Sequence, residues 1–263
     1  MPQVYNAIEL KEVTKAYDEK ARVLDRVSIA VPAGEFLAIV GPSGSGKTTL
    51  LRLINRLAEP SAGTVRVDGE NIHNTDPIGL RRRIGYVFQG IGLFPHMTVA
   101  ENIAITPRLI GWDDAKRTAR VQELLLLVRL DPAKYRDRFP AELSGGERQR
   151  VGVARALAAK PKIVLMDEPF GALDALTRDA LGRDYRGLHE KLGITTVMIT
   201  HDLTEAALLA DRIVVIHQGL LVEEGTPRDL MTAPKNVYVR ELVKTPRSQA
   251  ARLAALMKGE EPQ

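Results

Sequence analysis

The chain has 263 residues, of which 44% are hydrophobic and 27% charged, as in a globular protein with a sizeable core. It has no cysteine, which excludes a disulfide framework and thiolate metal sites. Its 37 basic and 33 acidic residues are interspersed, which argues against a dedicated nucleic-acid-binding face despite the net charge of +4. No apolar run approaches the ~20 residues that a membrane-spanning helix needs, so we expect none.

The first part of the chain is predicted to contain strands and one helix. Segments 7–17 and 23–32 alternate imperfectly between polar and apolar residues, and 34–41 is a short apolar strand that ends in glycine. Segment 63–72 is typical of a strand pair that turns at Asp68 and Gly69. Helical spacing after the glycine-rich stretch predicts one buried face, made of Leu50, Leu53, Ile54 and Leu57.

The middle of the chain has a different pattern. Residues 90–155 contain few β-branched runs, and an apolar stripe at helical spacing predicts a helix with one buried face. We interpret this part as a helical subdomain inserted into a domain that spans residues 1–240. The stripe consists of Val121, Leu124, Leu125 and Val128.

Strand patterns return after the helical part. Segments 162–169 and 194–202 are apolar strands separated by a helical stretch, which predicts an α/β fold with a mostly parallel sheet and helices on both faces. Segment 211–225 is typical of a hairpin that turns at Gln218. Residues 241–263 are expected to form a short polar tail with one short helical piece.

The strongest functional signal is GPSGSGKT, residues 41–48, which fits G-x-x-x-x-G-K-[ST] between a strand and a helix. Such a loop surrounds phosphate oxygens with backbone N–H groups, and the helix N-terminus adds its dipole. We expect Lys47 to reach the β and γ phosphates of ATP and Thr48 to bind Mg²⁺. A glycine/serine turn with a chance lysine is the alternative. Further nucleotide contacts are expected from Gly41, Ser43, Gly44, Ser45, Gly46 and Thr49.

Polar side chains follow three other apolar strands. Asp167 is expected to bind the metal ion, and Glu168 to act as base for the attacking water. His201 could hold the γ phosphate together with the water, and Gln89 could reach Mg²⁺ or the water. The alternatives are a solvated acidic pair, a structural histidine and a surface glutamine. The carboxyl ends of parallel strands meet at one edge, so we expect these residues beside the phosphates.

A second small-residue turn, Ser144-Gly145-Gly146, opens a helix about a hundred residues after the first. A helix N-terminus with a serine hydroxyl and bare backbone is suited to an anion. This turn is expected on the helical insertion, away from the phosphate loop of its own chain. We therefore expect two copies to pack head to tail, each turn serving the ATP of the other copy.

Together these motifs resemble those of ATP-binding cassette (ABC) ATPases, over about residues 8–225. The resemblance implies a RecA-like P-loop NTPase fold with an N-terminal antiparallel β subdomain and an inserted helical subdomain. It also implies that Tyr17 stacks on adenine, that Ser144 and Gly146 contact the γ phosphate of the partner copy, and that Asp174 links the two sites. The motifs are GPSGSGKT, Gln89, LSGGERQRV, IVLMDE, residues 172–174 and His201, in the family's order.

A single cassette without a membrane span is similar to the ATP-hydrolysing subunit of a prokaryotic importer. Segments 84–112 and 167–181 resemble osmoprotectant importers for glycine betaine, choline or carnitine. The resemblance implies permease subunits that dock near residues 89–99, a solute-binding protein, and a peripheral location on the cytoplasmic face of the plasma membrane. Importers of amino acids, sulfonates or nitrate, a soluble nucleic-acid-acting ATPase and a small-molecule kinase are the alternatives.

Overall fold

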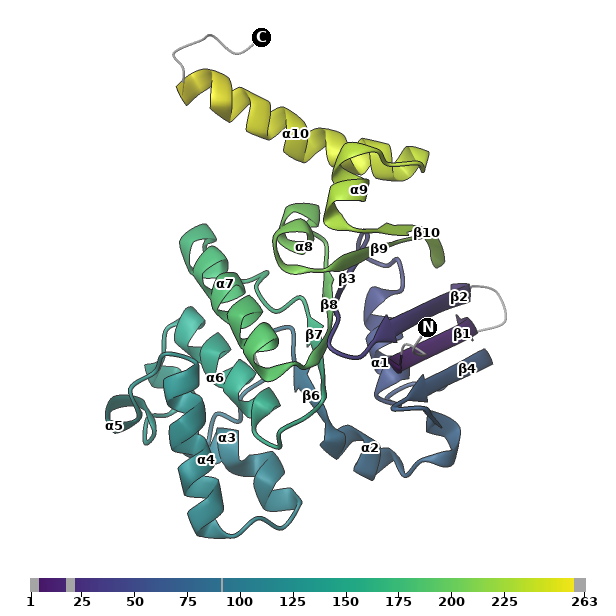
Figure 1. The fold of residues 1–263 in the computed structure, drawn as a ribbon. Helices are drawn as coiled ribbons and strands as arrows, with labels where there is room; N and C mark the ends of the chain where they lie inside the picture. Colours follow the sequence, from purple (N-terminus) through teal and green to yellow (C-terminus); the bar gives the residue numbers. More distant parts are fainter. Residues whose placement is uncertain (1–4, 18–21, 91, 258–263) are drawn as a thin grey trace.

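The computed structural model describes residues 5–17, 22–90 and 92–257, whose strands form two sheets (Figure 1). The first sheet is antiparallel, with the strand order β2-β1-β4-β5. Its last two strands turn at Asp68, as predicted for this segment. The bounds are Asn6–Ala16 for β1, Arg22–Pro32 for β2, Ala62–Val67 for β4 and Glu70–Asn71 for β5.

The second sheet has six strands in the order β10-β9-β3-β8-β7-β6. All neighbouring strands run parallel except β9 and β10, which form the predicted hairpin. The prediction of a mostly parallel α/β sheet is therefore confirmed. The bounds are Phe36–Val40 for β3, Ile84–Val87 for β6, Ile163–Asp167 for β7, Thr195–Thr200 for β8, Arg212–His217 for β9 and Leu220–Gly225 for β10.

The six-stranded sheet separates two hydrophobic cores. On β3, Phe36 and Ala38 face a core shared with most of the helices. Leu37 and Ile39 face the opposite core, which α1 and the antiparallel sheet complete. Alternate residues of a strand point to opposite faces, and here both faces are buried. Strand β3 is thus fixed from both sides, and the loop that follows it has a rigid base.

Helices pack on both faces of this sheet and at one end of it (Figure 1). The predicted stripe at residues 121–128 is buried on α4 and its cap. Within residues 90–155 the described elements are helical, and Figure 1 shows them grouped beyond β6. The bounds are Lys47–Ile54 for α1, Pro77–Arg83 for α2, Val99–Leu109 for α3, Asp114–Leu127 for α4, Pro132–Tyr135 for α5, Gly145–Leu157 for α6, Ala175–Leu192 for α7, Leu203–Leu209 for α8 and Pro227–Thr232 for α9, with single 3₁₀ turns at Ile72–Asn74 and Pro140–Glu142.

One residue of the predicted buried face of α1 is exposed. The helix ends at Ile54, and Arg56 adopts a left-handed φ of 54°. The chain therefore leaves the helix before Leu57, whose side chain is 53% exposed. The prediction for Leu57 was wrong because apolar periodicity continues past the point where the backbone turns away.

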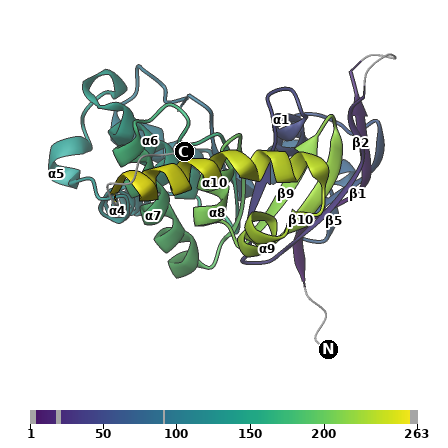
Figure 2. The ribbon, with the colours of Figure 1, turned by 90° about the horizontal axis from the view of Figure 1, so that it is seen from above.

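The C-terminal part forms a longer helix than predicted. Helix α10 spans Val237–Met257, so the expected boundary between residues 240 and 241 falls inside it. Val239 and Val243, one turn apart, are buried in the core that α8 and α9 share. Seen from above, α10 runs from the region over β9 toward the side that holds α6 and α7 (Figure 2). The prediction of a polar tail with one short helical piece rested on the polar residues that follow residue 241. No described helix is long and apolar enough to cross a membrane.

Candidate active site

The predicted site residues lie where the parallel strands end. The loop 41–46 follows β3, Gln89 lies two residues after β6, Asp167 closes β7, and His201 follows β8. Because β3, β8, β7 and β6 are neighbours and parallel, these four points share one edge of the sheet. This is the edge at which ligands bind in open α/β sheets.

The loop between β3 and α1 requires glycine at two positions. A Cβ on Gly41 would lie 2.1 Å from the carbonyl oxygen of Ile216, so this backbone packs directly on β9. Gly46 has a φ of 102°, and a Cβ there would lie 2.6 Å from the Leu24 side chain. A side chain at either position would displace the loop. The two glycines thus hold the loop against β9 and β2.

Lys47 and Ser45 both lie buried inside this loop. The Lys47 ammonium donates to the carbonyl oxygens of Gly41, at 2.7 Å, and Pro42, at 2.9 Å. Burial lowers the pKa of Lys47, and the nearby carboxylates of Glu168 and Asp167 oppose this shift. The hydroxyl oxygen of Ser45 is buried and has no hydrogen-bond partner among the described residues. An anion with several oxygens would give both groups better partners, so the loop fits a phosphate chain.

The other predicted loop residues have different environments. Ser43 and Gly44 are exposed, and Gly44 has a left-handed φ of 78° with open space around it. Thr49 is buried in the first turn of α1. Ser43, Gly44 and Thr49 carry no charge, so they can offer a ligand only backbone N–H groups and hydroxyls.

Asp167 is held from two sides. Its carboxylate accepts hydrogen bonds from the Thr48 hydroxyl at Oδ1 and from the Tyr86 hydroxyl at Oδ2, each at 3.4 Å. The side chain is 7% exposed, and burial raises the pKa of Asp167, against the effect of both hydrogen bonds. A hydroxyl and a carboxylate beside a phosphate loop fit Mg²⁺, which takes few protein ligands and completes its shell with phosphate and water oxygens. Among the described residues, no group of three or more His, Cys, Asp or Glu is placed to hold a metal ion.

Two of the predicted residues contact the Glu168 carboxylate. The Gln89 amide donates to Glu168 Oε2 at 3.3 Å, and His201 Nδ1 lies 3.2 Å from the same oxygen. Glu168 has a left-handed φ of 43°, and its backbone N–H donates to the Ile199 carbonyl at 3.0 Å. Such a conformation is costly for a residue with a side chain, and strained residues of this kind cluster at functional sites. The three predicted catalytic residues therefore converge on one oxygen.

A cavity of about 270 Å³ opens beside this cluster, which leaves room for a reacting group next to Glu168. Gln149 on α6 also lines it. This glutamine is 2% exposed, and its amide nitrogen has no hydrogen-bond partner among the described residues. Sequence reasoning missed Gln149 and Tyr86. Gln149 could have been found from the sequence, because it lies in the motif that begins at Leu143, five residues after Ser144. No sequence pattern indicates Tyr86, because its contact with Asp167 depends on how two strands pair.

Ser144, Gly145 and Gly146 open α6 as predicted. Ser144 is the N-cap: its hydroxyl accepts from the Glu147 N–H at 3.3 Å, and the Glu147 carboxylate accepts from the Ser144 N–H at 2.7 Å. Hydrogen bonds from the Tyr135 hydroxyl and from the Ser144 N–H lower the pKa of Glu147, and the one from Tyr135 has the larger effect. Ser144 is exposed, and no hydrogen bond of the described residues joins this turn to residues 41–48.

Asp174 is next to this turn. It is the N-cap of α7 and accepts from the Thr177 N–H at 3.0 Å, which lowers the pKa of the Asp174 carboxyl. A Cβ on Gly146 would lie 2.7 Å from the Thr177 methyl group. The first turns of α6 and α7 therefore form one surface of exposed helix N-termini.

Tyr17 lies just after β1 and is 60% exposed. The Lys15 ammonium is 4.8 Å from the centroid of its ring. An exposed aromatic ring at a strand end is available for stacking on a planar ligand.

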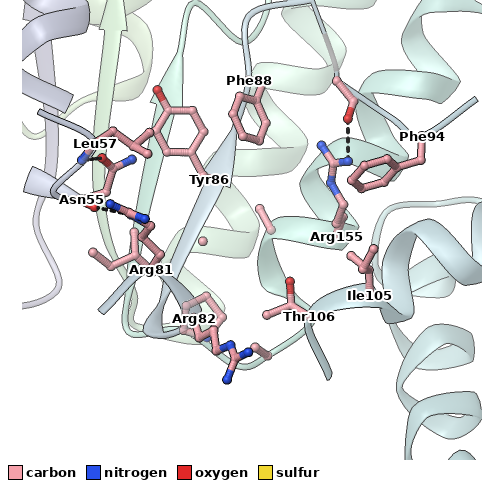
Figure 3. Close-up of a pocket in the computed structure, with 16 residues that line it drawn as sticks. Asn55, Leu57, Arg81, Arg82, Tyr86, Phe88, Phe94, Ile105, Thr106 and Arg155 are labelled. Atoms are coloured by element: carbon pink, nitrogen blue, oxygen red, sulfur yellow. Dashed lines mark hydrogen bonds between the residues drawn. The ribbon is translucent and has the colours of Figure 1, made fainter. Parts of the chain in front are cut away.

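A groove of about 390 Å³ lies between β6 and the helical part of the chain (Figure 3). Phe88 and Phe94 line it, with Arg155 within 6.0 Å of both ring centroids. The Arg155 guanidinium also donates to the Gly92 carbonyl at 2.7 Å. Arg81 and Arg82 lie at the other end of the groove, and none of the described residues that line it is Asp or Glu. The groove is therefore aromatic and basic.

Comparison with known proteins gives a consistent result. The family profile described as "ABC transporter" matches residues 24–171. The glycine betaine/carnitine/choline transport ATP-binding protein OpuCA of Bacillus subtilis is 50% identical over 236 residues, which are 90% of this chain and 62% of that protein. This chain thus spans about three fifths of that relative. The glycine betaine uptake system ATP-binding protein YehX of Escherichia coli is 46% identical over 89% of this chain and 75% of its own length.

A solved structure has a similar fold. It is an ATP-binding cassette in a dimeric post-hydrolysis state bound to ADP and Pi, and it superposes with a TM-score of 0.76 at 36% identity. The match covers 84% of this chain and 99% of the other. The solved structure thus agrees with the α/β architecture described above.

Proposed function

Because this chain belongs to the ABC transporter family, we propose that it is the ATP-hydrolysing subunit of an importer. One observation carries the proposal: the phosphate loop with Lys47, the metal carboxylate Asp167 and the hydrogen-bonded Glu168 meet at one edge of the sheet. Each is the residue type that phosphoryl transfer to water requires at that place.

The chain's own residues have distinct roles in this reaction. Lys47 and the N–H groups of the loop bind the phosphates, and Tyr17 stacks on the adenine. Thr48, Asp167 and Gln89 would hold Mg²⁺, which would neutralise charge that develops on the phosphate oxygens. Glu168 accepts a proton from the attacking water as the bond between the γ phosphorus and the β–γ bridging oxygen breaks, which yields ADP and phosphate. His201 and Gln89 hold the Glu168 carboxylate toward that water.

The exposed Ser144 turn supports a shared site. Its N–H groups and the neighbouring Asp174 lie on a surface without a hydrogen bond to their own phosphate loop, so a second copy packed head to tail would bring them to its ATP. A solved cassette of 36% identity is dimeric. In this arrangement ATP joins the two copies, and hydrolysis releases them.

The groove at Phe88 and Phe94 supports a membrane partner. The aromatic rings and arginines of this groove suit a helix of a permease subunit that presents apolar and acidic side chains, and docking there would place this chain on the cytoplasmic face of the plasma membrane. The transported solute is proposed to be a quaternary ammonium osmoprotectant, as in the names of the two relatives. A permease paired with a solute-binding protein would supply that selectivity.

Phosphate release by the purified chain tests the proposal. We expect Mg²⁺-dependent hydrolysis that rises more than linearly with protein concentration, with Lys47→Ala as the inactive control. Ser144→Arg should abolish hydrolysis while a fluorescent ATP analogue still binds. Hydrolysis at full rate by Ser144→Arg, or stimulation that requires DNA or RNA, would contradict the proposal. Uptake of labelled glycine betaine by vesicles with the permease then tests the solute.

A further inference from the structure

We propose that Tyr86 is a positioning residue, which orients the Asp167 carboxylate toward Mg²⁺. This inference rests on the proposed function, because that function assigns the metal ion to Asp167. Neither residue type nor motif pointed to Tyr86, which lies in the middle of a strand.

The geometry places one donor on each oxygen of Asp167. The Tyr86 hydroxyl donates to Oδ2, while the Thr48 hydroxyl donates to Oδ1, both at 3.4 Å. Rotation of a carboxylate about its last side-chain bond is soft, so one hydrogen bond alone leaves its plane free. Two donors on opposite oxygens fix that plane, and hydrogen bonds to a metal-binding carboxylate tune its affinity for the ion.

The backbone and ring of Tyr86 are themselves fixed. In the parallel register of β6 and β7, Tyr86 pairs with Leu165, two residues before Asp167. The ring packs against Phe88 with centroids 4.5 Å apart. In Figure 3 the two rings stand side by side, and the hydroxyl of Tyr86 points away from Arg81 and Arg82. The strand pairing and the ring contact therefore hold the Tyr86 hydroxyl next to the Asp167 carboxylate.

The same ring lines the groove proposed for the membrane partner. A helix in that groove would contact Tyr86, whose hydroxyl donates to the Asp167 carboxylate. Tyr86 thus connects the groove to the carboxylate that is proposed to hold the metal ion.

Tyr86→Phe tests the inference because it removes the hydroxyl and keeps the ring. Mn²⁺ is titrated by electron paramagnetic resonance into the full chain with a non-hydrolysable ATP analogue. We expect Mn²⁺ to bind at least about tenfold more weakly, as is usual when a partner of a metal ligand is lost. Affinity for the analogue in EDTA should stay unchanged. Combined with Asp167→Asn, the loss from Tyr86→Phe should largely disappear, since Tyr86 acts through Asp167.

Tyr185→Phe is the matched control. The Tyr185 hydroxyl is also buried and lies 2.9 Å from the Thr196 hydroxyl, but it does not contact Asp167. This variant should lower the melting temperature and leave Mn²⁺ affinity unchanged. If Tyr86→Phe binds Mn²⁺ like the wild type while Asp167→Asn does not, the positioning role is refuted and the proposed function stands. If Asp167→Asn also binds Mn²⁺ normally, the metal role of Asp167 fails, and the inference fails with it.

Discussion

Replacing Glu168 by glutamine separates catalysis from binding. Gln89 and His201 both approach Oε2 of Glu168, at 3.3 and 3.2 Å. A glutamine whose amide oxygen takes that place can accept from Gln89 and from a His201 tautomer that carries its proton on Nδ1. The cluster and the cavity beside it should therefore persist. What is lost is the proton acceptor for the attacking water.

The size of the effect follows from that loss alone. General-base catalysis contributes typically about 10²–10⁴ in rate, which is about 3–5 kcal/mol in the activation barrier. We expect Glu168→Gln to lower kcat by this factor and to leave ATP affinity within about twofold. Because ATP then persists, the ATP-bound dimer should accumulate.

Phosphate release and light scattering with Mg-ATP measure both effects. The control is Glu190→Gln, an exposed glutamate of α7 that pairs with Arg186 and should hydrolyse ATP normally. Turnover of Glu168→Gln within tenfold of the wild type would refute the assignment of Glu168 as the base. A fall in ATP affinity equal to the fall in rate would instead show that Glu168 acts in binding.

Three further predictions concern stability. Gly46→Ala should lower the free energy of unfolding, measured by urea denaturation, by about 1–3 kcal/mol. The reason is that the new Cβ would lie 2.6 Å from the Leu24 side chain, at a residue whose φ is 102°. An unchanged urea midpoint would contradict the described loop. Burial raises the pKa of Asp167, so the charged carboxylate lowers the stability of the fold above its unfolded pKa of about 3.9. Asp167→Asn should therefore raise the melting temperature at pH 7 without ligand, and this gain should vanish at low pH. A lower melting temperature of the variant at pH 7 would oppose this reasoning. Burial lowers the pKa of His189, so stability should fall as pH drops below about 6.5, and His189→Gln should flatten that fall in thermal melts.

The parts of the site that follow local chemistry were predictable from the sequence. The phosphate loop is a contiguous motif, and Asp167, Glu168 and His201 end apolar strands whose parallel arrangement brings them to one edge. Ser144 was found because it begins a helix at a small-residue turn, and Asp174 was found through the family resemblance; each is the N-cap of a helix. The motifs depend on residues adjacent in sequence, and the position of the strand-end residues follows from the rule that parallel strands end at one edge of the sheet.

Contacts between distant segments were not predictable in the same way. Tyr86 meets Asp167 only because β6 and β7 pair in one register, and nothing in either segment specifies that register. Leu57 was misassigned because the left-handed Arg56 ends α1 while the apolar spacing continues. The length of helix α10 was underestimated because its two buried valines pack in the core shared with α8 and α9, a contact that their own polar segment does not indicate.

Mixing two inactive variants tests the shared site most directly. In a head-to-tail dimer, Lys47→Ala spoils the phosphate loop of its own chain, and Ser144→Arg spoils only the site of the partner copy. A mixed dimer therefore contains one site with both defects and one intact site. Equal amounts should restore about a quarter of wild-type phosphate release, because about half of the dimers are mixed and each has one intact site. If the mixture releases no more phosphate than the two variants measured separately, two chains do not share their sites.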